Sequence, residues 1–443
     1  MFTNNSNERE VLSSLVNCKF EIDLVFVKLN CDGTEISGKG VLYIKEDGQF
    51  YLKFFNDHYF GDGERFEHLL SLPMNKTPIY SFAGNDENDK KYSCNYLFSG
   101  SPVLNVTEFK LSGKIEMDFP FSYNSKIVFS GEYNLPMDRI SHTKTTLSED
   151  LWYTDYNHVW EIPLREGITI IFSKFNSYTE AIFVGRNADQ VNYEFLERVV
   201  STFDFMTGKE TEPILMNVGK ECHCYYGRKN MLPADSKFMS PLSMSHNRGD
   251  EFTKSNHTEL FKSYFNFMDT QEGIILPVIH KRIVSSSCSY LFAMGLVLSV
   301  QIENLCKEFY YDWYVKDEKY TTEVKEAIQF LEMQYGCKFQ AVIERLKSTI
   351  PSSNKRSLNV KNILRNLCAK GIIDKDLIDS WIWIRNNTAH GENISGDTWS
   401  KFLDKSFSCI NLYYILIFRK IGYLGHMRYY TDAHNSKIIE LNV

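Results

Sequence analysis

The chain changes its hydrophobic periodicity once, and this change constrains the fold more than any other feature of the sequence. Between residues 20 and 186, apolar and polar side chains alternate in short runs such as FEIDLVFVKL and ITIIFSKF. A period of two predicts strands that bury one face. Beyond residue 250, apolar side chains recur every three or four positions, which predicts amphipathic helices. We therefore expect an α+β protein whose two structural types lie in separate domains.

The front half is expected to be a mostly antiparallel β-sandwich or barrel. Turn sequences such as CDGT, EDGQ and FGDGE separate its runs at short intervals. A helix is predicted over residues 187–208, ending at Gly208, and the strand-like run EPILMNVGKECHCYYG follows it. The expected domains are a β-rich sensor or regulatory domain (1–230), a linker rich in Pro, Ser, Asn and Gly (231–250) and an α-helical bundle (251–443).

The charge of the chain argues against one class of partner. A formal net charge of -7 and a pI near 5.9 argue against coating of nucleic acid by bulk electrostatics. Any RNA contact must come from a local cluster of cations, and NKRSLNVKNILRN supplies one. Its basic side chains are Lys355, Arg356, Lys361 and Arg365. A solvated helix face is the alternative interpretation, because charge clusters of this size are common.

Cysteine usage and hydropathy predict a cytoplasmic protein. The ten cysteines follow no spacing typical of a disulfide framework. The N-terminal MFTNNSNEREVLSS lacks the basic and apolar segments of a secretory signal. The most apolar runs, SYLFAMGLVLSV and CINLYYILIF, are about half the length of roughly 20 residues that a bilayer requires. We expect them to be core helices, and we expect no membrane contact.

The stretch WIWIRNNTAHGEN, residues 381–393, ends an apolar helix with a group of polar side chains. Asp374 is the expected N-cap of this helix. Arg385 and His390 are the side chains with chemical potential, and they lie five positions apart. At about 100° per residue, five steps leave them about 140° apart on an unbroken helix. They would then face different directions.

Two arrangements could bring the Arg and the His together. The residues between them are poor helix formers and Gly391 is a natural stop, so the helix is expected to fray or kink before His390. These poor helix formers are Asn386, Asn387 and Thr388. Alternatively, a two-fold dimer could place the motifs of both protomers in one cleft. Both arrangements can operate together.

This pattern of Arg385, a polar Asn386, a short spacer, His390 and a glycine resembles the motif of the HEPN superfamily of ribonucleases. A β-rich half ahead of such a domain resembles the ApeA type of bacterial anti-phage protein. The resemblance implies a HEPN-like helical bundle and a metal-independent endoribonuclease that needs no cofactor. It further implies abortive infection through cleavage of cellular RNA, with tRNA among the candidate substrates. A homodimer through the helical half and a phage-derived trigger of unknown kind belong to the same expectation.

The resemblance also implies roles for the three residues of the motif. RNA supplies its own nucleophile, the 2′-OH, so the site needs proton transfer and positive charge. His390 would transfer protons, because imidazole titrates near neutral pH. Arg385 would bind the phosphate oxygens in the transition state, and Asn386 would orient the His or a phosphate oxygen. The implied products carry a 2′,3′-cyclic phosphate and a 5′-OH.

Other interpretations of the same residues stay open. The bundle could be catalytically silent and only dimerise, coupled to a β domain that binds a ligand. Alternatively, Arg385 and His390 could be unrelated residues at the end of a helix. A second match, Arg428 and His434 in RYYTDAH, lacks the polar residue after Arg and is interpreted as chance. Glu303, in an apolar helix, is expected either to point into a dimer cleft near the motif or to lie at the boundary of the helix face.

A zinc site is a further alternative, outside the helical half. Four side chains with nitrogen or sulfur donors gather in one part of the sequence, although Cys-x-Cys is tighter than the usual ligand spacing. These residues are Cys222, His223, Cys224 and His246. No metal is expected in the proposed ribonuclease site.

Overall fold

The computed structural model divides the chain into two compact units. They are Met1–Ser236 with Met244–Thr258, and Lys237–Ser243 with Glu259–Val443. The described residues are 6–31, 34–46, 48–56, 80–99, 106–111, 114–118, 125–131, 133, 135–136, 139–148, 151–165, 167–175, 178–211, 213–219, 221–225, 238–242, 251–287, 289–314, 318–349, 359–390, 396–432 and 435–441.

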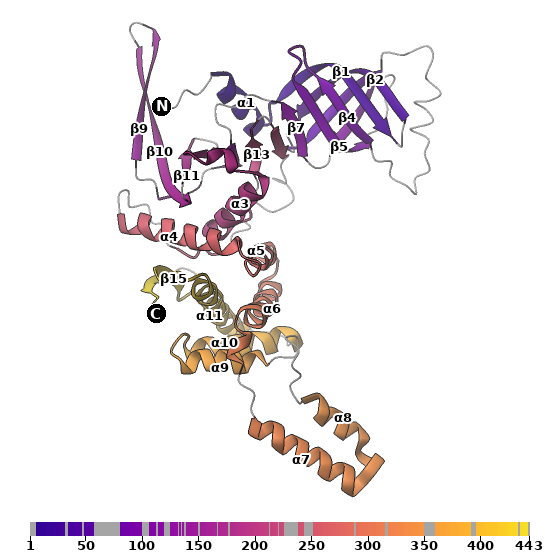
Figure 1. Ribbon diagram of the computed structural model, residues 1–443, viewed down its shortest axis with the longest axis vertical. Coiled ribbons are helices and arrows are strands. Elements are labelled where there is room, and N and C mark those ends of the chain that lie inside the picture. The colour runs from indigo at the N-terminus through magenta and orange to yellow at the C-terminus, as the bar shows by residue number, and fades with distance from the viewer. Residues whose placement is uncertain are drawn as a thin grey trace. The chain divides into compact units, whose positions relative to one another are not determined.

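The first unit is built on antiparallel strands, as the alternating pattern predicted (Figure 1). Within the described residues one sheet has the order β4-β1-β2-β3-β6-β5-β7-β14-β13-β8-β12-β11-β10-β9, and its pairings are antiparallel. The strands are β1 (Glu21–Cys31), β2 (Thr34–Ile44), β3 (Phe50–Asn56), β4 (Tyr80–Asn85), β5 (Lys91–Ser99), β6 (Val106–Leu111), β7 (Lys114–Asp118), β8 (Ser125–Ser130), β9 (Arg139–Ser148), β10 (Leu151–Arg165), β11 (Ile168–Lys174), β12 (Tyr178–Val184), β13 (Pro213–Val218) and β14 (Glu221–Tyr225).

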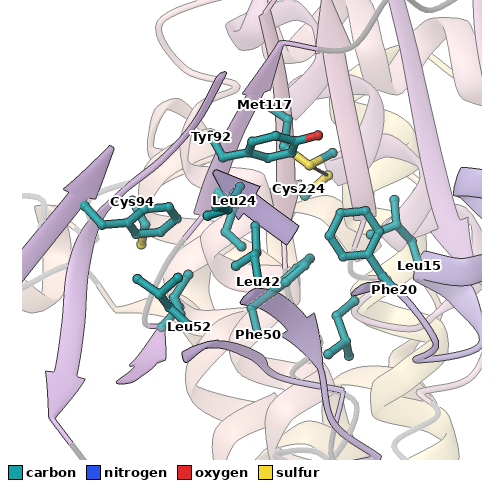
Figure 2. Close-up of a cluster of buried hydrophobic side chains, with 14 of the residues drawn as sticks. Leu15, Phe20, Leu24, Leu42, Phe50, Leu52, Tyr92, Cys94, Met117 and Cys224 are labelled. Atoms are coloured by element: carbon teal, nitrogen blue, oxygen red, sulfur yellow. Dashed lines mark hydrogen bonds between the residues drawn. The ribbon is translucent and has the colours of Figure 1, made fainter. Parts of the chain in front are cut away.

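The first six strands close on themselves. β4 pairs with β1 and also with β5, so β4-β1-β2-β3-β6-β5 form a ring of strands. Alternate side chains of these strands point inward. Leu52 of β3 and Leu42 of β2 are two of them, and both leucines are fully buried. Helix α1 (Ser6–Val16) adds Leu15 to the same apolar cluster, which Figure 2 shows.

The remaining strands carry helix α3 (Tyr193–Thr207) against one face, after the short η1 (Ala188–Gln190). Phe203 of α3 stacks on Phe129 of β8, with ring centroids 4.6 Å apart, and on Phe172 of β11, at 5.3 Å. The side chain of Asn192 caps the start of α3, and Gly208 ends it in the left-handed conformation with φ 64°. The predicted stop at Gly208 is therefore confirmed.

An ionic cluster is buried on the other side of β8. The ammonium of Lys126 is completely buried and lies 3.2 Å from a carboxylate oxygen of Glu180 on β12. It also donates a hydrogen bond to Glu8 of α1. A buried cation needs such partners, because loss of its hydration would otherwise cost several kcal/mol, on the order given for single buried ions. The cluster therefore ties α1 to the sheet.

The second unit is helical, as the change of periodicity predicted. Helices α6, α10 and α11 pack against one another, and α9 packs against α6 and α10 (Figure 1). The elements of the helical half are α4 (Glu251–Met268), whose first residues belong to the first unit, α5 (Ile275–Ser286), α6 (Leu291–Phe309), η3 (Tyr311–Trp313), α7 (Glu318–Tyr335), η4 (Gly336–Phe339), α8 (Gln340–Thr349), α9 (Val360–Ala369), α10 (Lys375–His390) and α11 (Gly396–Ile421), followed by the hairpin β15 (His426–Tyr430) and β16 (Ser436–Glu440).

The structure differs from the expected linker over residues 231–250 where it describes that segment, at residues 238–242. Phe238 and Leu242 are buried, so this part of the chain is held by apolar packing. Tyr414 of α11 donates a hydrogen bond to the carbonyl of Met239, and the backbone N–H of Arg428 donates one to Pro241, at 2.9 Å. The other residues of the expected linker lie outside the described residues.

Candidate active site

Helix α10 carries the Arg and His motif, and its first three turns form the expected apolar face. α10 begins at Lys375, directly after the expected cap Asp374. Leu377, Ile378, Trp381 and Ile384 are buried against the rest of the helical unit. The indole N–H of Trp381 donates a hydrogen bond to the carbonyl of Ser299 on α6, at 3.0 Å. This burial fixes which residues of α10 face outward.

Arg385 follows directly on the buried Ile384 and points toward α6. Its Nε and its Nη2 both lie 2.8 Å from Oε1 of Glu303. The Arg385 side chain is 45% exposed and the Glu303 side chain 17% exposed. Glu303 therefore lies at the boundary of its helix face and contacts Arg385 of the motif, while its place in a dimer cleft stays a prediction. One edge of the guanidinium is oriented by Glu303 while the group stays accessible to solvent.

The helix does not fray between the Arg and the His, so the first of the two arrangements is not observed as a break in α10. α10 is continuous from Lys375 to His390. Two side chains of this stretch bond within the helix: the amide of Asn387 donates to the carbonyl of Trp383 at 2.7 Å, and the hydroxyl of Thr388 donates to the carbonyl of Ile384 at 2.8 Å. On a regular helix positions 385 and 390 lie about 140° apart. Within one α10, these two positions do not share a face.

The polar residue after Arg385 is accessible. Asn386 is exposed on α10, on the surface of the helix next to the guanidinium. Cys306, about one turn beyond Glu303 on α6, offers no nucleophile. Cys306 is fully buried, and burial, together with the charge of Glu303, raises the pKa of its thiol. Among the residues of the motif whose side chains the structure describes, the exposed groups are therefore the guanidinium of Arg385 and the amide of Asn386.

Aromatic side chains surround this end of α10, and the sequence patterns did not single them out. Trp383 of α10 meets Phe402 of α11 edge to face, with ring centroids 6.1 Å apart. Trp399 of α11 lies nearly parallel to Phe402, at 6.4 Å, and is 45% exposed. Three tryptophans in and just after the motif stretch were the available signal, but a helical pattern cannot tell core from rim.

The basic cluster expected to bind RNA is described only in part. Lys361 and Arg365 lie on α9, four residues apart and thus on one face of the helix. Arg365 is exposed and Lys361 is half-buried. Lys355 and Arg356 lie outside the described residues. Their contribution to RNA binding stays a prediction.

The residues considered for a zinc site do not gather where the structure describes them. Cys222 and Cys224 lie on β14 and point into the apolar cluster of the strand ring. His223, between them, points to the opposite face, where it stacks on Tyr193 with ring centroids 3.9 Å apart. The alternation of a strand thus separates the imidazole from both thiols. His246 lies outside the described residues.

The second Arg and His match has a different setting. Arg428 lies on β15, where its Nε donates a hydrogen bond to the hydroxyl of Ser436 at 2.8 Å. His434 lies outside the described residues.

No described helix combines the length and the apolarity needed to cross a membrane. Comparisons of the chain with protein-family models, with curated proteins and with solved structures found no match.

Proposed function

We propose that the protein is a metal-independent endoribonuclease of the HEPN type that acts through Arg385, Asn386 and His390. The observation that carries the proposal is the contact between Glu303 and Arg385. An ion pair between two partly exposed side chains adds little stability, typically up to about 1 kcal/mol. Orientation of a guanidinium beside an exposed Asn386 is useful, in contrast, where a phosphate must be bound in one geometry.

The chemistry assigns one task to each residue of the motif. His390 takes the proton from a 2′-OH or gives one to the departing 5′ oxygen. Arg385 binds the oxygens of the phosphorus centre where negative charge develops in the transition state. Asn386 forms a hydrogen bond that orients either the imidazole of His390 or a phosphate oxygen. The products are a 2′,3′-cyclic phosphate and a 5′-OH end.

A homodimer is part of the proposal, and the spacing of the motif on α10 supports it. Positions 385 and 390 lie about 140° apart on a continuous helix, so they are on different sides of one copy of α10. A second copy can supply the missing side chain. Helix α6 offers a surface for it: Leu296 and Val300 are each 38% exposed, and Leu296 lies two turns before Glu303 on the same face. A partner on this stripe would lie beside Arg385.

The β-rich half is proposed to sense a trigger and to restrain the nuclease. The closed ring of strands supports a barrel rather than a sandwich for its first part. On the resemblance of the sequence, we propose a cytoplasmic defence protein that responds to a phage-derived trigger by cleaving cellular RNA. Lys361 and Arg365 of α9, with Lys355 and Arg356, are proposed to bind the RNA backbone.

The rival function is a ligand-binding β domain with a helical half that dimerises without catalysis. It takes α10 as an ordinary continuous helix whose positions 385 and 390 lie on different sides and have no joint task. The rival predicts that substitution of the motif changes no reaction. Both functions share the dimer, so oligomeric state alone does not separate them.

Cleavage of RNA by the protein in an extract of phage-infected cells, which supplies the trigger, separates the two when a chelator is present. The wild type should cut RNA and leave 2′,3′-cyclic phosphate ends, whereas Arg385→Ala and His390→Ala should leave it intact with unchanged thermal stability. Equal RNA integrity for all three proteins favours the rival. Cleavage that requires an added cation contradicts the metal-independent mechanism.

A further inference from the structure

Phe402 of α11 forms the floor of an aromatic cluster on the surface of the helical unit. Its ring is completely buried and lies against Gly295 of α6. A Cβ atom at position 295 would come within 2.7 Å of Cζ of this ring. Glycine at this position therefore allows α6 and α11 to approach closely enough to seat Phe402.

Three further aromatic rings surround this floor, and they come from three helices. Phe292 of α6 stacks on Phe402, with centroids 4.7 Å apart and an interplanar angle of 27°. Trp383 of α10 contacts it edge to face, and Trp399 of α11 lies nearly parallel to it, at an angle of 14°. The orientations of the rings are thus held by packing from α6, α10 and α11.

The outer part of this cluster is open and carries a cation. Trp399 is 45% exposed, although large aromatic side chains normally bury most of their surface. The ammonium of Lys401 lies 5.2 Å from the centroid of Trp383. Lys405, one turn further along α11, donates a hydrogen bond to Ser380 of α10 at 3.2 Å. The surface therefore combines indole rings with positive charge.

The face of α10 that carries Trp383 also carries position 390. Trp383 and position 390 are seven residues apart, which is two turns of helix with an offset of about 20°. Asn387 lies between them on the same face, and its amide donates to the carbonyl of Trp383. The aromatic cluster is thus on the face of α10 that leads to position 390, away from the face of Arg385.

We propose that Trp383, Trp399 and Lys401 form a subsite for an unpaired nucleotide of the RNA. A nucleobase stacks on the exposed face of Trp399, and its phosphate lies near Lys401, since stacking on aromatic rings beside a cation is the usual mode of binding single strands. The subsite rests on the proposed ribonuclease function, and it names the substrate as single-stranded RNA. Duplex RNA, whose bases are stacked on each other, cannot use it.

Charge favours RNA over a second copy of the chain as the occupant. A two-fold contact centred on this cluster would bring Lys401 of two copies close together, and like charges repel. A phosphate group is complementary to the same ammonium. The uncharged stripe of Leu296 and Val300 on α6 suits a second copy better.

The test is the affinity of the full-length protein for labelled oligouridine with 2′-O-methyl groups, measured by fluorescence anisotropy. This probe cannot be cleaved, because it lacks a free 2′-OH, so binding is measured whether or not the protein is a nuclease. Trp399→Ala should weaken binding about tenfold. Trp399→Phe should retain most of the affinity, since it keeps an aromatic face. The matched control is Phe330→Ala on α7, where an aromatic side chain is also exposed, at 58%; it should bind as the wild type does.

The proposal is overturned if Trp399→Ala binds the probe as tightly as the wild type, if Trp399→Phe is as weak as Trp399→Ala, or if the wild type binds the single strand no better than a duplex of the same length. It is also overturned if Trp399→Ala abolishes self-association in sedimentation but leaves the affinity unchanged. Cleavage of RNA by the wild type with no effect of Trp399→Ala on binding would remove the subsite and leave the proposed function. Binding that depends on Trp399 without any cleavage would do the reverse.

Discussion

One carboxylate oxygen of Glu303, Oε1, lies 2.8 Å from both Nε and Nη2 of Arg385. The two residues come from α6 and α10 and are 82 positions apart in the sequence. Because Arg385 is 45% exposed, the ion pair contributes at most about 1 kcal/mol to stability, as surface pairs do. What the pair does is orient the guanidinium of Arg385.

Glu303→Gln should therefore lower the rate of RNA cleavage and leave the protein folded. The amide keeps one hydrogen-bond acceptor but loses the charge that holds Arg385, so we expect about a tenfold loss of activity, equivalent to about 1.4 kcal/mol. The measurement is the initial rate on labelled RNA together with the melting temperature. Glu332→Gln is the matched control, because Glu332 of α7 also pairs with a cation, Lys347 of α8, and neither residue belongs to α6 or α10. Equal rates for both variants contradict a positioning role of Glu303.

Removal of the buried cation Lys126 should destabilise the first unit strongly. Lys126→Met leaves the carboxylates of Glu8 and Glu180 buried without their cation, and breaking a buried pair in this way costs about 3–5 kcal/mol. Urea unfolding measures the loss. The triple variant Lys126→Met, Glu8→Gln, Glu180→Gln should recover part of it, because it removes both uncompensated charges. A triple variant less stable than Lys126→Met alone contradicts this explanation.

Gly295→Ala should destabilise the helical unit, although alanine is the better helix former. The substitution favours helix by up to about 1 kcal/mol. The new Cβ would lie 2.7 Å from Cζ of the buried Phe402, and overpacking of this kind costs about 1–3 kcal/mol. Thermal unfolding measures the net effect. In a Phe402→Leu background, which removes the clashing atom, the same change should be neutral or stabilising; an unchanged cost there contradicts the assigned clash.

Acid should destabilise the first unit through a buried imidazole. Burial lowers the pKa of His257, and its hydrogen bond to the Thr253 carbonyl opposes this only in part. In the unfolded chain the pKa returns to about 6.5. The folded state then binds fewer protons than the unfolded state, so the contribution of His257 is fully present above about pH 6.5 and is lost as the pH falls through the folded pKa. Burial and the charge of Lys114 lower the pKa of His223 in the same direction.

The free energy of unfolding, measured at several pH values between about 8 and 5, checks this prediction. The wild type should lose stability below about pH 6.5. His257→Leu should lose less over the same interval, because the titrating group is gone while the site stays apolar. A parallel decline in both proteins would show that His257 is not a cause.

Local signals in the sequence predicted much of the fold. The stop of α3 at Gly208 and the buried face of α10 depend on nearby residues, and both were visible as patterns. The closure of the strand ring by β4 and β5 was not visible, because it depends on pairing between strands of similar alternating character. Helix α1 was missed for a similar reason: its docking depends on Glu8 and on the distant Lys126.

The candidate site was predicted in its residues but not in its geometry. Arg385 and His390 were identified from their spacing, and Glu303 from its charge within an apolar helix. The expected break is not observed: α10 continues through Asn387 and Thr388, which are poor helix formers in isolation, because the apolar face that ends at Ile384 packs the helix against its neighbours. Helix propensity alone could not reveal this.

The most direct test of the account is complementation between two inactive variants. Arg385→Ala and His390→Ala are purified, unfolded and refolded together in equal amounts, and the RNA-cleaving rate of the mixture is compared with each variant and with the wild type. If two chains share one site, both variants are inactive and the mixture recovers about a quarter of the wild-type rate, since about half of randomly formed dimers are mixed and half of their sites are intact. The account is contradicted if either variant alone cleaves RNA at the wild-type rate. It is also contradicted if the wild type is active and the mixture is as inactive as each variant alone.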